Sequence, residues 1–272
     1  MKKHISYRSA ELLNHLIQMD LQFFTLSDAM KILSSSEPDA VRKLLADMTK
    51  RELLLRIKDG LYHIIPYEKN SKEYFPNWHL TAEAIVHQQN YYIGFYSALD
   101  IHGLITQPSL SEQVVTVKQV VPKIQKVKTI KFEFITFSKN KFFGYEKTWI
   151  DDFNKVNCSN LEKTFIDCLY KPNYANGVTE IAKAIYKTRE KVKPERMIEY
   201  LERFDAQVVK KRIGFLLQHL DIFQELRKEI QLKLTSAYTL MDPSLPKQGK
   251  HNSEWKILDN VDVTSVLKSI ET

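Results

Sequence analysis

The N-terminal part of the chain carries apolar residues at helical spacing, at Val41, Leu44, Leu45 and Met48. This i, i+3, i+4, i+7 pattern predicts a helix with one apolar face turned toward a core. Ser36 is a candidate N-cap for it, and Pro38 suits its first turn. A shorter helix is predicted before it, over residues 25–33, and a Ser-rich turn joins the two.

Two β-prone runs follow, over residues 53–57 and 61–65. Asp59-Gly60 lies between them and is a strong hairpin signal. Two short helices followed directly by a hairpin predict a winged helix-turn-helix. Residues 7–19 are predicted to form its first helix, with four apolar side chains turned inward: Leu12, Leu13, Leu16 and Ile17.

The pattern loses its period after Pro66, which predicts two domains, a winged helix-turn-helix over residues 1–70 and a larger domain over 78–272. In the second, a helix is expected first, at 80–89. The expected strands lie at 91–95, 114–121, 130–137, 145–150 and 237–241, with 255–258 pairing to the last. Helices are expected from 159 onward, with a terminal one at 263–270. The fold class is therefore α+β, with a small basic sheet and a helical bundle in the second domain.

Composition limits the classes of function. The chain has 272 residues, 43% hydrophobic and 27% charged, and a net charge of +7, which suits a polyanionic partner. Cys158 and Cys168 have no metal-binding spacing, so we expect free thiols and a cytoplasmic protein. We expect no membrane partner, because no apolar run approaches the length of a membrane span.

The predicted second helix and the hairpin supply candidate DNA contacts. Residues in the N-terminal half of a recognition helix read base edges: Ser36, Glu37, Asp39, Arg42 and Lys43. Cations farther along position the protein on phosphates: Lys50, Arg51, Arg56 and Lys58. Basic residues of the second domain are candidates for further backbone contacts: Lys118, Lys126, Lys128, Lys131, Lys210, Lys211 and Arg212. The run 210–212 is expected to point partly outward.

Each of these features has a simpler interpretation. Basic residues opposite an apolar stripe also form an ordinary solvated helix face. Between residues 114 and 150 there are eight lysines and two glutamates. Lysines on a sheet also protect its edges from aggregation, and the two interpretations have similar weight there.

No catalytic residue, metal ligand or cofactor is assigned, since the chain contains none of the phosphate-cradling glycine motifs or the nucleophile elbow. Asp151-Asp152 is an acidic pair of the kind metal nucleases use, but a polar turn explains it better. Lys163 and Asp167 lie one helical turn apart and are interpreted as a structural pair.

Five segments together carry a resemblance to a known family. They are the hairpin 56–62, the stretch 92–99 with 102–104, the stretch 160–169 followed by Pro172, the run 211–217, and the loop 242–249 with Asn252 and Trp255. In this order they resemble the AbiEi-family antitoxins, the transcriptional regulators of type IV toxin–antitoxin (abortive infection) systems. Asp59 departs from the family's hairpin, where a basic residue is expected.

The resemblance implies a repressor that binds inverted repeats in its own promoter through the winged helix. It also implies an antiviral role, in which the protein neutralises a nucleotidyltransferase-type toxin through the C-terminal domain. Direct toxin binding is left open, because type IV partners need not bind one another. Two alternatives remain: an antitoxin that sequesters its toxin by direct contact, and a nuclease or nucleotidyltransferase that uses the winged helix for targeting.

Overall fold

The computed structural model describes residues 4–87, 89–105, 107, 109 and 111–263 and has a mixed α+β fold. The chain folds into two compact units. The first contains the residues up to 88 together with 126–130, and the second contains 89–125 and everything from 131 onward. The units thus divide after residue 88, whereas the sequence pattern suggested boundaries at 70 and 78.

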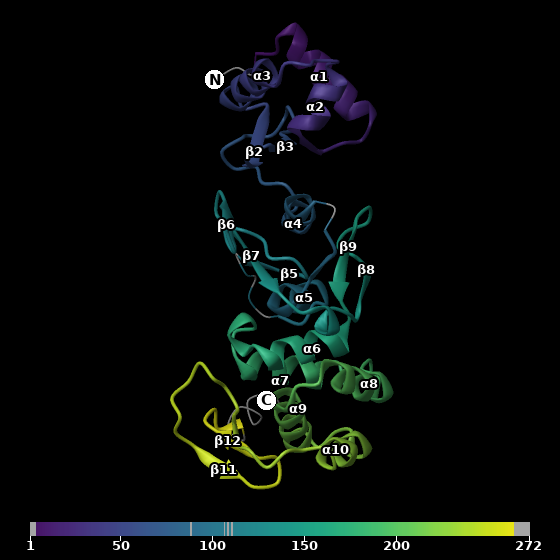
Figure 1. Ribbon diagram of the computed structural model, residues 1–272, viewed down its shortest axis with the longest axis vertical. Coiled ribbons are helices and arrows are strands. Elements are labelled where there is room, and N and C mark those ends of the chain that lie inside the picture. The colour runs from purple at the N-terminus through teal and green to yellow at the C-terminus, as the bar shows by residue number, and fades with distance from the viewer. Residues whose placement is uncertain (1–3, 88, 106, 108, 110, 264–272) are drawn as a thin grey trace. The chain divides into compact units, whose positions relative to one another are not determined.

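The first unit contains α1 (Tyr7–Gln18), α2 (Leu26–Ile32) and α3 (Pro38–Lys50), followed later by α4 (Trp78–Val86) (Figure 1). The first three helices share an apolar core that includes Leu12, Leu16, Ala29, Val41, Leu45 and Met48. The predicted inward positions of α3 are therefore confirmed, with Leu44 partly buried. In α1 the prediction is wrong for Ile17, whose side chain is 66% exposed.

A small antiparallel sheet completes this unit. Its strands are β1 (Phe23–Thr25), β2 (Leu54–Lys58) and β3 (Leu61–Ile64), in the order β1-β3-β2. β2 and β3 form the predicted hairpin, and Gly60 in its turn has a φ of +70°, a conformation that favours glycine. A register shift lies between Arg56 and Lys58.

The second sheet has six strands in the order β6-β7-β5-β4-β9-β8. The strands are β4 (Tyr91–Ile93), β5 (Ser111–Thr116), β6 (Ile124–Val127), β7 (Ile130–Thr136), β8 (Tyr145–Trp149) and β9 (Lys155–Ser159). β5 pairs with β7 and β4 with β9 in parallel, while β4–β5 and β8–β9 are antiparallel. The strands predicted at 130–137 and 145–150 are confirmed. The strand predicted at 114–121 instead spans 111–116, and β6 and β9 were not predicted.

Helices pack against this sheet and against one another (Figure 1). They are α5 (Phe95–Ile101), α6 (Leu161–Tyr170), α7 (Val178–Lys187), α8 (Pro194–Phe204), α9 (Gln207–His219) and α10 (Gln224–Gln231). α6 contacts α5, α7, α8 and α9, so it lies at the centre of this packing. Because of this position, eight of its ten residues are buried.

A third, three-stranded sheet follows, of β10 (Thr239–Leu240), β11 (Lys250–Asn252) and β12 (Ile257–Asp259). β10 pairs with β12, as the sequence suggested for residues 237–241 and 255–258, and the pairing is parallel. The predicted terminal helix at 263–270 lies almost wholly outside the described residues. Across the described part of the chain, no helix is both long and apolar enough to cross a bilayer.

Candidate nucleic-acid interface

The turn between α2 and α3 is preceded by a capping box at the start of α2. The Asp28 carboxylate accepts the Thr25 N–H (2.8 Å), and Thr25 Oγ1 accepts the Asp28 N–H (3.2 Å). This exchange satisfies backbone donors that the first turn of a helix leaves open. Residues 33–37 then connect α2 to α3, and Ser34 takes a left-handed conformation with a φ of +47°. The two helices are thereby joined by a short turn.

Helix α3 has two distinct faces. Val41, Leu45 and Met48 are at most 2% exposed and pack into the core. Arg42 and Lys43 lie on the exposed side. Arg42 Nη1 is 2.8 Å from the Asp39 carboxylate, but these side chains are 61% and 95% exposed. An exposed pair of this kind contributes little free energy, so a phosphate or a base edge can replace Asp39 as the partner of Arg42.

The N-terminal end of α3 differs from the prediction in one detail. Glu37, not Ser36, is the N-cap residue, and no side chain caps the helix. The proposed capping role of Ser36 is therefore wrong. Ser36, Glu37 and Asp39 are all exposed, so the helix presents polar and acidic groups at the end where base contacts were expected.

Arg51 lies at the end of α3 and is engaged within the protein. Its guanidinium donates to the carbonyls of Asp47 (3.1 Å) and His4 (3.2 Å) and to Ser9 Oγ (3.2 Å). These bonds tie the end of α3 to the start of α1. Arg51 is thus a structural residue, which its sequence position did not reveal, whereas its neighbour Lys50 is exposed.

The two hairpin cations have different surroundings. Arg56 forms an ion pair with Asp59, and their side chains are 55% and 96% exposed. Lys58 Nζ donates to the carbonyl of Ile85 in α4 (2.6 Å), and partial burial lowers the pKa of Lys58. Arg56 is therefore the hairpin cation with the more accessible charge.

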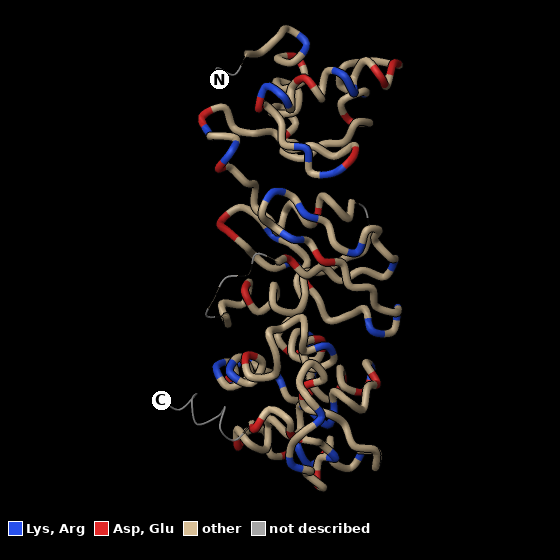
Figure 2. The backbone as a smooth tube through the Cα atoms, turned by 90° about the vertical axis from the view of Figure 1, so that its left-hand side faces the viewer, with Lys and Arg blue, Asp and Glu red and all other residues tan. Residues whose placement is uncertain are grey.

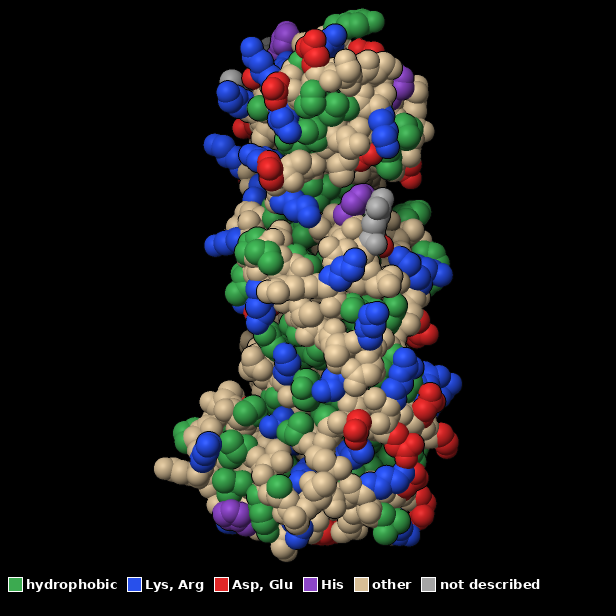
Figure 3. Space-filling view, in the orientation of Figure 1, with side chains coloured by type: hydrophobic (Ala, Val, Ile, Leu, Met, Phe, Trp, Pro, Cys, Tyr) green, Lys and Arg blue, Asp and Glu red, His purple; other side chains and the backbone are tan. Residues whose placement is uncertain are grey.

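The lysines predicted for the second domain lie at the β6–β7 hairpin and the segment before it, and two of them, Lys126 and Lys128, belong to the first unit. Lys118 and Lys126 are exposed, and Lys131 lies 3.4 Å from the Glu133 carboxylate. Lys128 Nζ donates to the carbonyls of Ser71 and Tyr74, and burial lowers its pKa. Lys and Arg are distributed along both units rather than in one block, among Asp and Glu (Figures 2 and 3).

The run Lys210 to Arg212 is buried, which corrects the expectation that it points partly outward. The three residues are 8%, 1% and 3% exposed. Lys211 Nζ donates to Thr235 Oγ1 and the carbonyl of Ala237. Arg212 donates to the carbonyls of Leu169 (2.6 Å) and Leu240 (3.0 Å), and burial lowers its pKa to about 10.

These contacts explain how consecutive cationic residues can be buried in α9. Long cationic side chains can bury their stems and deliver their charge to backbone carbonyls. Here Lys211 and Arg212 hold α9 against α6, against the segment that leads into β10 and against β10 itself. The run 210–212 is therefore removed from the candidate DNA contacts.

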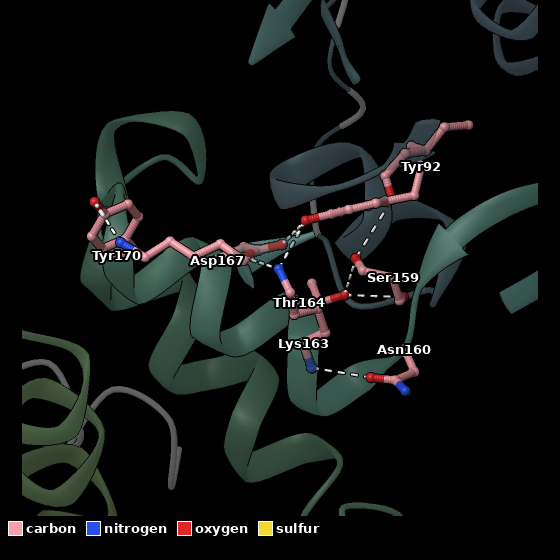
Figure 4. A network of polar contacts seen from close by, with 9 residues as sticks. Tyr92, Ser159, Asn160, Lys163, Thr164, Asp167 and Tyr170 are labelled. Atoms are coloured by element: carbon pink, nitrogen blue, oxygen red, sulfur yellow. Dashed lines mark hydrogen bonds and ion pairs between the residues drawn. The ribbon is translucent and has the colours of Figure 1, made fainter. Parts of the chain in front are cut away.

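A buried polar network lies around α6 (Figure 4). Lys163 Nζ donates to Tyr92 Oη (2.8 Å) and to the Asp167 carboxylate, and Tyr92 Oη donates to Asp167 Oδ2 (2.8 Å). Burial lowers the pKa of Lys163 and raises that of Asp167. The side chains of Lys163 and Asp167 are 0% exposed, so the predicted structural pair is confirmed. Sequence reasoning missed Tyr92, which is distant in the chain.

Asp151 is part of a tight turn, as the sequence suggested. Its carboxylate accepts the N–H groups of Phe153 (2.9 Å) and Asn154 (2.7 Å), and these bonds lower its pKa. Among the described residues there is no group of three or more His, Cys, Asp or Glu side chains that could hold a metal ion.

Comparison with solved structures identifies a fold relative. The chain is similar to the crystal structure of the RV2827C protein from Mycobacterium tuberculosis, with a TM-score of 0.76 over 99% of this chain and 97% of that chain. The two sequences are 12% identical, so the likeness concerns the fold alone. No known protein family and no curated protein matches the sequence.

Proposed function

We propose that the protein is a sequence-specific DNA-binding repressor whose first unit is a winged helix-turn-helix. The observation that carries this proposal is the exposed face of α3, with Arg42 and Lys43, followed in the chain by a hairpin with an exposed Arg56. A helix with one face in a core and a polar, basic face in solvent suits the major groove. The short turn from α2 supports the same geometry.

In this proposal the contacts divide by chemistry. Side chains in the N-terminal half of α3 read base edges, with Arg42 as the main donor: a guanidinium can donate two hydrogen bonds to a guanine. Lys50 and Arg56 contact phosphates and set the register on the duplex. Lys118, Lys126 and Lys131 are weaker candidates for further phosphate contacts.

The test is a gel-shift titration of the purified full chain on the DNA upstream of its own gene, over a salt series. Random DNA of the same length serves as the competitor. A repressor prefers the upstream fragment at every salt concentration, and its affinity falls steeply as salt rises because phosphate contacts release counterions. Equal affinity for both DNAs would contradict sequence-specific recognition.

We further propose, from the resemblance to AbiEi-family antitoxins, that the protein is the antitoxin of a type IV toxin–antitoxin system with a nucleotidyltransferase-type toxin. Its second unit carries four of the five resembling segments. The test is growth rescue when the full chain is co-expressed with the candidate toxin. Arg42→Ala is the informative variant, because protection that persists without DNA recognition separates neutralisation from repression. Co-purification of the two proteins would favour direct sequestration instead.

A further inference from the structure

Three lysines and two tyrosines of the second unit are linked by their side chains. Lys123 Nζ donates to Tyr174 Oη (2.7 Å) and lies 5.4 Å from the centre of that ring. Lys171 Nζ lies 5.9 Å from the centre of the same ring and 6.0 Å from that of Tyr170. Lys141 Nζ donates to Tyr170 Oη (3.3 Å) and lies 4.6 Å from its ring centre. Cations and rings therefore alternate in a lysine–tyrosine row: Lys123, Tyr174, Lys171, Tyr170 and Lys141.

The tyrosine rings of this row are held in place by the core of the second unit. The ring of Tyr174 packs against that of Phe95, with 5.2 Å between their centres. The ring of Tyr170 packs against those of Phe204 (5.1 Å) and Phe137 (6.1 Å). The three phenylalanines are buried, while the two tyrosines are partly exposed. The row is thus ordered without a ligand, and little freedom is lost when one binds.

The positive charge of the lysine–tyrosine row has no counterion beside it. Among the residues that the structure describes, no carboxylate lies within ion-pair distance of its three lysines. Glu133 and Asp167 act on the row only from a distance, and each is engaged elsewhere. Glu133 lies 3.4 Å from Lys131 Nζ, and Asp167 accepts from Lys163. Ammonium groups gathered in this way repel one another, so the row favours an anionic ligand.

The row is also rich in hydrogen-bond donors. Each ammonium has three N–H groups, and each tyrosine oxygen accepts from a lysine while its own proton stays available to donate. Within the described ranges, no acceptor takes the hydroxyl proton of Tyr170 or Tyr174. A pair such as Lys123 and Tyr174 can therefore present an N–H and an O–H to one phosphate group. Hydrogen bonds from a cation to a phosphate are among the stronger ones in proteins.

We propose that the lysine–tyrosine row binds the backbone of a single-stranded nucleic acid, with its ammonium groups on successive phosphates. One ammonium and one hydroxyl suffice for a single phosphate, whereas three cations in a row suit a chain of them. Cations that alternate with aromatic rings suit a single strand, because the rings contact bases that a duplex keeps stacked inside. The proposal is independent of duplex recognition by the first unit, since all five residues belong to the second.

Lysine acetylation followed by mass spectrometry tests the site in the unaltered full chain. The probe is a mixed-sequence RNA of about 12 nucleotides without self-complementarity. We expect the RNA to slow acetylation of Lys123, Lys141 and Lys171 several-fold. Lys228, an exposed lysine of the same unit, is the internal reference and should react at an unchanged rate. Absence of this protection, or equal protection by duplex DNA or by inorganic tripolyphosphate, would overturn the proposal.

Variants test the same contacts by fluorescence anisotropy with this RNA over a salt series. Lys123→Gln, Lys141→Gln and Lys171→Gln together should weaken binding at least about 10-fold. They should also reduce the salt slope by about two units, since each phosphate contact on a single strand contributes about 0.7. The charge-matched control replaces with glutamine three exposed lysines elsewhere in the second unit: Lys191, Lys228 and Lys247. Equal losses in both triple variants would attribute binding to net charge and overturn the proposal.

A gentler variant separates the hydroxyl groups from the charges. Tyr170→Phe combined with Tyr174→Phe keeps the rings, their packing and all three ammonium groups. It should weaken RNA binding a few-fold and leave the salt slope unchanged, because donors are lost and phosphate-neutralising charges are not. Unchanged affinity in this variant would exclude the hydroxyl groups from the site and contradict the proposed geometry.

Discussion

Gly214 in α9 lies directly against the indole of Trp255. A Cβ atom at Gly214 would lie far inside van der Waals contact with Cζ3 of Trp255. The indole Nε1 donates to the side chain of Gln218, one turn farther along α9, and Trp255 is 1% exposed. Two of the segments that carry the family resemblance, 211–217 and the loop ending at Trp255, are therefore two halves of one packing contact.

This contact predicts the sign of Gly214→Ala. In an unconstrained helix alanine would be more stable than glycine by about 1 kcal/mol. Here the added methyl group collides with the indole, so we expect a net loss of about 1–3 kcal/mol in urea unfolding followed by circular dichroism. In a Trp255→Leu background the same substitution should become neutral or stabilising. A loss that is unchanged in that background would show that the collision is not the cause.

The Lys163–Asp167 pair predicts a large effect of removing one charge. Lys163→Met leaves the Asp167 carboxylate buried without its cation, and we expect a loss of about 3–5 kcal/mol in the free energy of unfolding. Adding Asp167→Leu should recover part of this loss. The control is Lys183→Met, which breaks a partly exposed pair with Glu180 and should change stability by less than about 1 kcal/mol. Similar losses in Lys163→Met and Lys183→Met would contradict this account.

Local periodicity was sufficient to predict the helices and the hairpin of the first unit and the strand at 130–136. These elements repeat their apolar positions over several residues, so each can be identified without its neighbours. β9 could not be identified in this way. It pairs antiparallel with β8, its neighbour in the sequence, and in parallel with β4, with Ile93 opposite Cys158. Its five residues contain only two apolar side chains, Val156 and Cys158, which is too few for a periodic signal.

Periodicity also fails to predict burial where a charged side chain is buried or an apolar side chain is exposed. The run Lys210 to Arg212 suggested a surface, but Lys211 and Arg212 donate to carbonyls of other segments, and Lys210 lies 3.7 Å from the Asp205 carboxylate. Ile17 suggested the core, but its side chain is 66% exposed. A pattern identifies an amphipathic face and does not tell whether the same chain covers it.

His63 predicts a pH dependence of stability. Burial lowers its pKa to about 4 from a usual value of 6.5, and its Nε2 lies 2.9 Å from the hydroxyl of Tyr74. The folded protein therefore holds His63 neutral, while the unfolded chain takes up a proton below about pH 6.5. Neutral His63 therefore makes its full contribution to the free energy of unfolding above pH 6.5. This contribution falls by about 3 kcal/mol as the pH decreases toward 4.

The measurement is urea unfolding of the full chain and of His63→Phe at several pH values from 4 to 8. Phenylalanine keeps the ring packing against Phe23 and Tyr74 but cannot be protonated. The difference in stability between the two proteins should change through the window from pH 6.5 to 4 and be constant above it. A constant difference across the whole range would exclude the proposed titration of His63.

Arg42 and Lys50 test the division of roles along α3. Arg42→Ala should reduce the preference for the upstream DNA over random DNA by about 1–3 kcal/mol, because a base contact is lost. Lys50→Ala should weaken binding to both DNAs alike and reduce the salt slope by about one unit. Lys228→Ala is the charge-matched control, since it removes an exposed cation of the second unit. If Arg42→Ala and Lys50→Ala give the same pattern, the roles are assigned wrongly.

At Asp59 the hairpin differs from the family it resembles, in which a basic residue is expected. Because Asp59 forms an ion pair with Arg56, we expect this difference to affect DNA affinity. The carboxylate holds the accessible hairpin cation and itself repels phosphate. We expect Asp59→Asn to bind both upstream and random DNA a few-fold more tightly, with a salt slope steeper by up to about one unit. Asp152→Asn, at an exposed aspartate of another hairpin, makes the same change in net charge and should have a smaller effect. Equal gains from the two variants would attribute the effect to net charge alone and would remove Arg56 from the interface.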